Sequence, residues 1–421
     1  MSNTVDDELI ERLRDAEGRA REGLASEDDL GFLIECLDQD DPHVLRSVVT
    51  SLDLMASKGL GSPEAVDKLI PRLLGGDVMT RSLAAACIGR LATFSIFRED
   101  SIPVLISGLD DESPFVREWC AHALSSLARH GVLSHVALTP LIDVLQDDYP
   151  RAREWASTAL MQMAMQGVVS TDAVPALLTL LFDEDEDVRT WAAKALLAMS
   201  HDEEAADAIF FVLRRFLSSD DDEFVKAATW LLGEMAEEGV FSEQFLPELL
   251  ANLDHSDPLV LHGTCVTLSS MAKQKCCTDD AGLMLVDLML HPDPKVRTAA
   301  AWALGIMAAM EHPTLNALPI MVEWMEAGGP EDRKVAAFSL GAHALYGVMI
   351  PEALPGLQAL LMDEEPFVRM WACTALGGMA AEGLGRREAL EDLNRLLDDE
   401  DEGVRENAAW ALKGLKALGL E

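Results

Sequence analysis

One ten-residue motif, V-R-x-[W/A]-A-x-x-A-L-[G/x], recurs eleven times along the chain of 421 residues. Eight of the ten intervals between its first residues, here called anchors, are 36 residues long, and the other two, of 37 and 35 residues, flank Val225. A fixed period of this size predicts a solenoid, in which each unit buries its apolar face only against its neighbours. The anchors are Val44, Thr80, Val116, Ala152, Val188, Val225, Val260, Val296, Asp332, Val368 and Val404.

Each repeat reads as two helices joined by an acidic turn. Apolar side chains recur at helical spacing in residues 102–109, and the turn that follows, at residues 110–112, supplies carboxylates that can cap the second helix. The second helix runs for about 15 residues from the anchor and ends at a glycine able to adopt the left-handed conformation, as at Gly131, Gly167 and Gly383. Prolines that suit the first turn of the first helix stand thirteen residues before five anchors, at Pro103, Pro175, Pro247, Pro319 and Pro355.

These patterns predict an all-α fold. We expect an α-solenoid, coiled as a right-handed superhelix, of about eleven antiparallel helix pairs of 36 residues each. Residues 1–25 are expected to form an N-terminal capping helix, and residues 26–421 a continuous repeat array whose last repeat acts as the C-terminal cap. The length fits one array, because a solenoid can grow past the roughly 300 residues that limit a single-core domain.

A cation follows the anchor in nine of the eleven repeats. A guanidinium at this position can reach the acidic turn of its own or the adjacent repeat and bond to carboxylates and free carbonyls. We therefore predict a structural ladder, which we favour over an anion-binding role. Its members are Arg81, Arg117, Arg153, Arg189, Lys226, Arg297, Arg333, Arg369 and Arg405.

The helix-A proline, the aspartate-rich turn, the V-R pair and the A-L-G ending together resemble HEAT repeats, above all the short HEAT-like type of the phycobilin lyases. They are also similar to armadillo repeats. The resemblance covers residues 26–418 and implies the solenoid fold but no particular activity, since such arrays serve many unrelated roles. Two repeats depart from the pattern: one has Leu261 in place of the cation and Gly263 within the second helix, and another has Asp332 as its anchor.

The net charge of −40 narrows the choice of partners. Ten lysines and 23 arginines face 73 acidic residues, and this scarcity of lysine resembles the proteins of salt-accumulating halophiles, particularly haloarchaea. The alternative is an acidic scaffold protein from a non-halophilic source. In either case we expect no nucleic-acid partner, because binding phosphates requires a basic surface.

The sequence favours a cytoplasmic protein. Its longest apolar stretches are of helix size and broken by charges, and its first residues lack the order of a signal peptide, so we expect no membrane insertion. The adjacent Cys276 and Cys277 lack the spacing of a zinc site, and no metal site is expected. Four further cysteines, which occupy second-helix positions of small apolar residues and indicate a reducing compartment, are Cys87, Cys120, Cys265 and Cys373.

Enzymatic signatures are absent from the sequence. No histidine precedes a glutamate, as the di-iron site of the HEAT-like deoxyhypusine hydroxylases requires, and there is no phosphate-binding loop, zinc-protease motif or nucleophile elbow. The charge also argues against the DNA glycosylases that share this fold. We expect neither catalysis nor a cofactor. The alternative is a bilin-lyase-like HEAT enzyme or chaperone acting on a chromophore protein, a family without a sharp catalytic motif.

Aromatic residues gather on one stripe of the second helices. In arrays of this kind the second helices line the concave face, and the third and sixth residues after the anchor share one side of the helix. Such a stripe is typical of a protein-binding surface; the alternative is that its rings fill the joints between consecutive helices. The predicted binding residues are Trp119, His122, Trp155, Trp191, Lys194, Trp302, Phe338, Trp371 and Trp410.

We therefore expect a non-catalytic scaffold or adaptor that binds protein partners along its concave face. The resemblance to haloarchaeal proteins implies one setting in which HEAT-like adaptors occur, namely taxis signalling.

The acidity leads to a prediction about salt. If the charge is an adaptation to a salt-rich cytoplasm, the folded chain should need about molar KCl, because the screening length then falls to roughly 3 Å and self-repulsion weakens. Thermal unfolding followed by circular dichroism at low and at molar salt measures this dependence. An unfolding midpoint that does not change with salt would contradict the halophilic interpretation.

Overall fold

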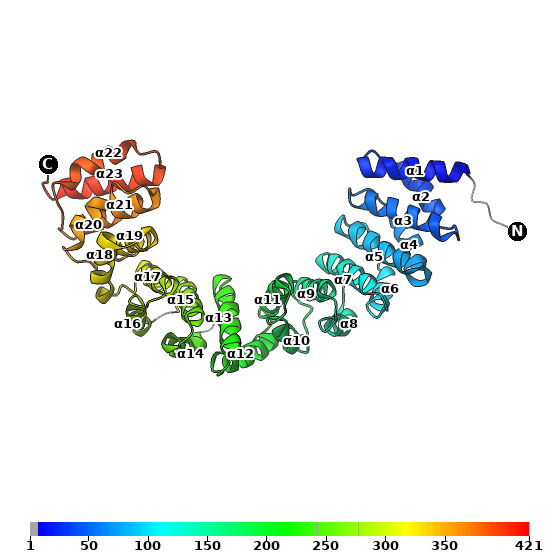
Figure 1. The fold of residues 1–421 in the computed structure, drawn as a ribbon, viewed down its shortest axis with the longest axis horizontal. Helices are drawn as coiled ribbons and strands as arrows, with labels where there is room; N and C mark the ends of the chain where they lie inside the picture. The colour runs from blue at the N-terminus through cyan, green and yellow to red at the C-terminus, as the bar shows by residue number, and fades with distance from the viewer. Residues whose placement is uncertain (1–6, 241–242, 277, 421) are drawn as a thin grey trace. The chain divides into compact units, whose positions relative to one another are not determined.

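The computed structural model describes residues 7–240, 243–276 and 278–420. Within these ranges the regular structure consists of 23 α-helices and five short 3₁₀ helices, without a strand (Figure 1). The predicted all-α fold is therefore confirmed. Cys277, which the spacing argued against as a zinc ligand, lies outside the described residues.

The second helices of the repeats, called B helices from here on, begin 36 residues apart without exception. The motif intervals of 37 and 35 residues therefore reflect a one-residue shift of Val225 and Lys226 within their helix, where Phe224 occupies the anchor position. The B helices are α3 (Pro42–Ala56), α5 (Val78–Thr93), α7 (Pro114–Arg129), α9 (Pro150–Met165), α11 (Glu186–Met199), α13 (Asp222–Glu237), α15 (Pro258–Lys273), α17 (Pro294–Ala309), α19 (Pro330–Leu345), α21 (Pro366–Ala381) and α23 (Glu402–Ala417).

The first helices, called A helices, are shorter, and nearly all of them pack against the B helix that follows in the chain. Helix α1 (Asp7–Glu22), in the segment predicted to form a cap, packs against α3 in the same way as consecutive B helices pack against each other. The A helices are α2 (Glu27–Cys36), α4 (Pro63–Gly75), α6 (Ser101–Gly108), α8 (Leu138–Val144), α10 (Ala173–Leu180), α12 (Glu203–Leu217), α14 (Leu246–Ala251), α16 (Asp279–Leu288), α18 (Leu318–Ala327), α20 (Ala353–Leu360) and α22 (Ala389–Arg395).

The 3₁₀ helices flank A helices. Three precede one, namely η1 (His135–Ala137), η2 (Glu243–Phe245) and η4 (Leu315–Ala317), and two follow one, namely η3 (Asn252–Asp254) and η5 (Leu396–Asp398).

Both predicted helix boundaries are present. Seven B helices begin at an aspartate of the acidic turn whose side chain accepts hydrogen bonds from backbone N–H groups of the first turn. The closing glycines Gly131, Gly167 and Gly383 have φ values of 69°, 76° and 85°. The turn carboxylates and the glycines therefore delimit the B helices that carry them, as expected.

The chain forms two compact units, residues 1–211 and 212–421, and the boundary falls within α12. The 36-residue period continues across this boundary, so the boundary could not be predicted from the repeat pattern. Among the described residues no helix is long and apolar enough to cross a bilayer.

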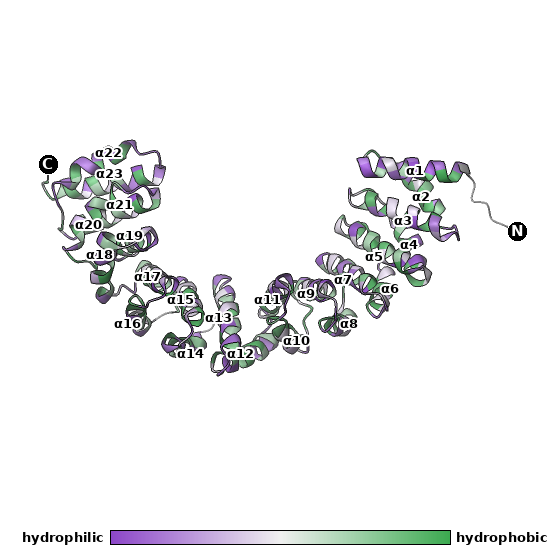
Figure 2. Ribbon diagram, in the orientation of Figure 1, coloured by the Kyte–Doolittle hydropathy of each residue, from purple (hydrophilic) through white to green (hydrophobic). Residues whose placement is uncertain are grey.

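In each unit the most extensive contacts join consecutive B helices. Most helices carry both apolar and polar residues, as Figure 2 shows. Glycines at the last motif position allow a ring of the next B helix to approach the backbone: a Cβ placed on Gly305 would lie 2.5 Å from Cε1 of Phe338, and one on Gly377 would lie 2.2 Å from Cζ3 of Trp410. The close approach of B helices thus depends on the absence of a side chain at these positions.

A substitution at this joint should destabilise the fold. Gly305→Ala places a methyl group against the Phe338 ring and 3.1 Å from Cα of Ser339, so we expect a loss of about 1 to 3 kcal/mol in the free energy of unfolding. Gly18→Ala is the matched control, because a Cβ there has no neighbour within 4 Å and should stabilise α1 by up to about 1 kcal/mol. Urea unfolding of both variants tests the joint. A Gly305→Ala variant as stable as the native chain would contradict it.

Candidate functional site

The predicted binding residues lie on B helices of both units, and we call this set of residues the aromatic row. In the N-terminal unit, Trp119 and His122 lie on α7 and Trp155 lies on α9. The His122 ring meets both indoles edge to face, with centroids 5.3 Å from Trp119 and 4.4 Å from Trp155. These three half-buried rings therefore form one contact chain across two repeats.

A charged pair that the sequence did not reveal supports this group. The Arg90 guanidinium lies over the Trp119 ring at 5.3 Å, and its Nε lies 2.7 Å from a carboxylate oxygen of Asp53. Burial raises the pKa of Asp53. Burial is the main cause that lowers the pKa of His122 to about 4, and the positive charges of Arg90 and Arg129 contribute less. The imidazole is therefore neutral at pH 7.

Trp191 and Lys194 on α11 complete the row in this unit. The Lys194 ammonium lies 4.4 Å from the Trp191 ring centroid, within range of a cation–π interaction. Trp191 is half-buried and Lys194 is exposed. Their contact shows that the row carries at least one exposed cation beside its rings.

In the C-terminal unit the row is partly buried. Phe338 stacks on Trp302 at 4.3 Å and meets Trp371 edge to face at 4.9 Å, and only 5% of its surface is exposed. Phe338, predicted to bind a partner, therefore fills the joint between helices and offers little surface. Phe367, which precedes its anchor and was not singled out, joins the cluster 6.2 Å from Trp371.

Two tryptophans of the row are clearly exposed. Trp410 on α23 is 42% exposed and lines a groove of about 300 Å³ with Leu345, Met370 and Trp371. Trp230 on α13 is 41% exposed, and it is not among the predicted binding residues because the motif places the anchor of its repeat at Val225. Counted from Phe224, Trp230 is the sixth residue and belongs to the row.

Five of the predicted ladder arginines bridge consecutive repeats through the same pair of positions. Each of these arginines pairs with an aspartate 30 residues further along, in the next A–B turn. The arginines also donate to carbonyls of their own turn, as Arg153 does to Asp147 at 2.8 Å. The five pairs are Arg81–Asp111, Arg117–Asp147, Arg153–Asp183, Arg333–Asp363 and Arg369–Asp399.

The aspartates of these pairs also hold the turn in which they lie. Asp147 accepts hydrogen bonds from Arg117 and from the backbone N–H of Tyr149. Burial by itself would raise the pKa of Asp147, but these hydrogen bonds outweigh it and lower the pKa below its ordinary value. One carboxylate therefore links a turn to the preceding B helix.

The remaining ladder positions differ. Arg189 and Arg405 donate to carbonyls of their own turns, at 2.7 and 2.8 Å to Asp183 and Asp399. Lys226 reaches Asp257 at 2.7 Å. Arg297 lies 3.8 Å from Asp332, the residue that replaces an apolar anchor.

The described residues offer little for metal or thiol chemistry. Among them no group of three or more histidine, cysteine or carboxylate side chains could hold a metal ion. Burial raises the pKa values of the thiols of Cys265 and Cys373 to about 12, so both are protonated and unreactive at neutral pH.

Helix pairs that follow one another at a fixed period, with consecutive B helices packed together within each unit, define an α-solenoid. The sequence matches the family model of HEAT repeats over most of its length, at residues 66–161, 140–233, 246–341 and 318–413. The chain therefore belongs to the HEAT-repeat family. No curated protein matches it in sequence.

Two solved structures share this fold. Importin beta superposes with a TM-score of 0.71 and 13% identity, covering 96% of this chain and 59% of its own. The karyopherin Kap121p, bound to the extreme C-terminus of the protein phosphatase Cdc14p, superposes with a TM-score of 0.64 and 13% identity, covering 94% of this chain and 46% of its own. The chain thus spans about half the length of these proteins, and the likeness concerns the fold alone.

The ladder contacts predict a difference between two arginines. Arg153 binds Asp183 through two hydrogen bonds, of 2.7 and 2.8 Å, with side chains 15% and 7% exposed. Arg153→Ala leaves that carboxylate without its partner, so we expect a loss of about 1 to 3 kcal/mol in unfolding free energy. Arg405→Ala, the control, removes bonds to turn carbonyls only and should cost less. Equal losses, or reduced partner binding at unchanged stability, would contradict a structural role.

Proposed function

We propose that the chain is a non-catalytic scaffold or adaptor that binds protein partners along the aromatic row. The exposure of Trp230 and Trp410 on the B helices is the observation that most supports this function. An exposed indole is a large and rigid apolar surface, and covering it with a partner is favourable. Aromatic anchors of this kind supply much of the binding energy of protein interfaces.

The surroundings of Trp410 support the same function. Its ring borders the groove of about 300 Å³, and Leu345 at the same groove is half exposed. A hollow apolar surface beside an exposed ring suits an apolar side chain of a partner. Kap121p, a solenoid of this fold, has been captured with a segment of another protein bound, which makes peptide binding a reasonable role for this chain.

The buried members of the row contribute differently. Phe338 and its neighbours Trp302 and Trp371 are in contact between consecutive B helices. In our proposal they fix the positions of the exposed residues of the row and do not themselves contact the partner. We further propose a cytoplasmic location, which is supported by the buried free thiols of Cys120 and Cys373, since such thiols persist in a reducing compartment.

The proposal predicts that an exposed ring of the row contributes to binding. Partners captured on the tagged chain from its native cells, at a salt concentration that keeps it folded, provide the ligand. Trp410→Ala should weaken binding by about 2 kcal/mol or more, because 42% of the residue is exposed and free to contact a partner. Its buried part packs against Gly377, so binding is compared under conditions in which circular dichroism shows the variant to be folded. Leu283→Ala is the control, because Leu283 is 50% exposed on the A helix α16. Lost binding in the control and full binding by Trp410→Ala would contradict the proposal.

A further inference from the structure

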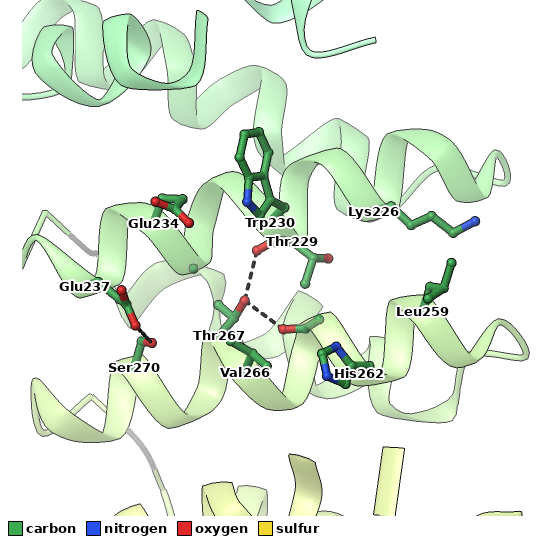
Figure 3. A pocket seen from close by; sticks show the side chains of 12 residues that line it. Lys226, Thr229, Trp230, Glu234, Glu237, Leu259, His262, Val266, Thr267 and Ser270 are labelled. Atoms are coloured by element: carbon green, nitrogen blue, oxygen red, sulfur yellow. Dashed lines mark hydrogen bonds between the residues drawn. The ribbon is translucent and has the colours of Figure 1, made fainter. Parts of the chain in front are cut away.

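A groove lies between α13 and α15, at the repeat that departs most from the motif. Its volume is about 380 Å³. Figure 3 shows the side chains that line it from both helices. They include Trp230, Glu234 and Glu237 from α13 and Leu259, His262 and Val266 from α15.

Two glycines create the groove. Gly263 occupies the third position after its anchor, where four other repeats carry a tryptophan of the aromatic row. At the equivalent joint between α19 and α21, the ring of Trp371 covers Gly341, and a Cβ there would lie 2.5 Å from Cε3 of the indole. Gly233 corresponds to Gly341, but a Cβ on Gly233 would meet only Thr267 Oγ1, at 3.3 Å. The groove is therefore the space that an indole fills at the other joint.

The floor and rim of the groove are suited to an apolar group. Thr267, on the floor, donates its hydroxyl to the carbonyl oxygens of Thr229, at 2.9 Å, and Gly263, at 3.0 Å, so its polar atom is already paired (Figure 3). On the rim, Leu259 is 59% and Val266 is 42% exposed. With Trp230, these residues surround one hollow with exposed apolar surface.

The open charge at the groove is negative. Glu234 and Glu237 are both exposed on α13, and among the described residues Glu234 makes no ion pair, while Glu237 has only a distant one, with Lys273 at 3.8 Å. The ammonium of Lys226 is held by Asp257 and Glu223 at 2.7 and 3.0 Å.

The imidazole in the groove adds no positive charge. Burial lowers the pKa of His262, and the positive charge of Lys295 lowers it further, while the negative charge of Asp293 acts in the opposite direction. The net effect is a lowered pKa, which keeps the ring neutral at pH 7. A cation near α13 would therefore meet carboxylates and the face of an indole without a competing charge.

We propose that this groove binds one aromatic side chain of a protein partner, with an adjacent lysine or arginine pairing with Glu234 and Glu237. The aromatic ring fills the space left by Gly263, and the cation lies between the two carboxylates and Trp230. This proposal rests on the proposed protein-binding function and specifies the partner at one position of the row.

Short labelled peptides test the proposal on the full chain. The probes are Gly/Ser peptides with a central Lys-Trp-Lys, and matched peptides with Glu-Trp-Glu or Lys-Ala-Lys. Fluorescence anisotropy is measured at the lowest salt concentration that leaves the circular dichroism spectrum unchanged. We expect Lys-Trp-Lys to bind about tenfold more tightly than either matched peptide. Equal binding of the three peptides would overturn the proposal.

Variants of the groove locate the binding. Gly263→Trp supplies the missing ring from the chain itself and should abolish binding of Lys-Trp-Lys. Gly263→Ala should retain it, because the added methyl requires only a small shift of the Thr229 methyl group, which lies 3.2 Å away. Trp230→Ala, at an exposed ring, should weaken binding at least about fivefold even if Gly263→Trp fails to fold. The double change Glu234→Gln and Glu237→Gln should remove the preference for Lys-Trp-Lys over Glu-Trp-Glu.

The outcomes separate this proposal from the function on which it rests. Binding of Lys-Trp-Lys that survives both Gly263→Trp and Trp230→Ala overturns the groove proposal. If Trp410→Ala nevertheless fails to bind the captured natural partner, the proposal that the row binds proteins is supported and only the groove proposal is wrong. If neither groove variants nor Trp410→Ala affect the natural partner, both proposals fail.

Discussion

The close approach of consecutive B helices is the constraint on which the rest of the structure depends. Glycine at the last motif position lets a ring of the next helix lie against the backbone, as Phe338 does at Gly305 and Trp410 at Gly377. Because every B helix begins 36 residues after the previous one, equivalent positions meet where consecutive B helices pack within a unit. Some of the rings at these joints, such as Phe338, are covered by their neighbours, whereas others, such as Trp410, keep exposed surface.

The ladder adds polar contacts to this apolar joint. A carboxylate such as Asp147 fixes its own turn through the N–H of Tyr149 and receives the guanidinium of the preceding repeat, so one side chain joins two repeats. The pattern breaks at Leu261, which is buried where nine of the eleven repeats have a cation, and at Gly263 two residues further on. In this repeat the loss of the cation and the loss of the ring coincide, and the groove between α13 and α15 results.

Much of this arrangement could be predicted from the sequence, because helix caps, closing glycines and the cation after the anchor are local signals that recur in most of the eleven repeats. What could not be predicted depends on the neighbouring helix. The burial of Phe338 follows from Trp302 and Trp371 on the adjacent helices, and Arg90 reaches Trp119 across a joint. Trp230 was missed for a different reason. Val225 matches the motif, but it lies one residue after Phe224, which occupies the anchor position of α13.

The central claim is that the B helices present the binding surface, and hydroxyl-radical footprinting of the chain with and without its captured partner tests it most directly. Trp230 and Trp410 report on the B helices, and Met362, 61% exposed after the A helix α20, reports on the A helices. The account predicts that the partner lowers oxidation of at least one of these tryptophans and leaves that of Met362 unchanged. Protection of Met362 with both tryptophans oxidised as in the free chain would contradict it.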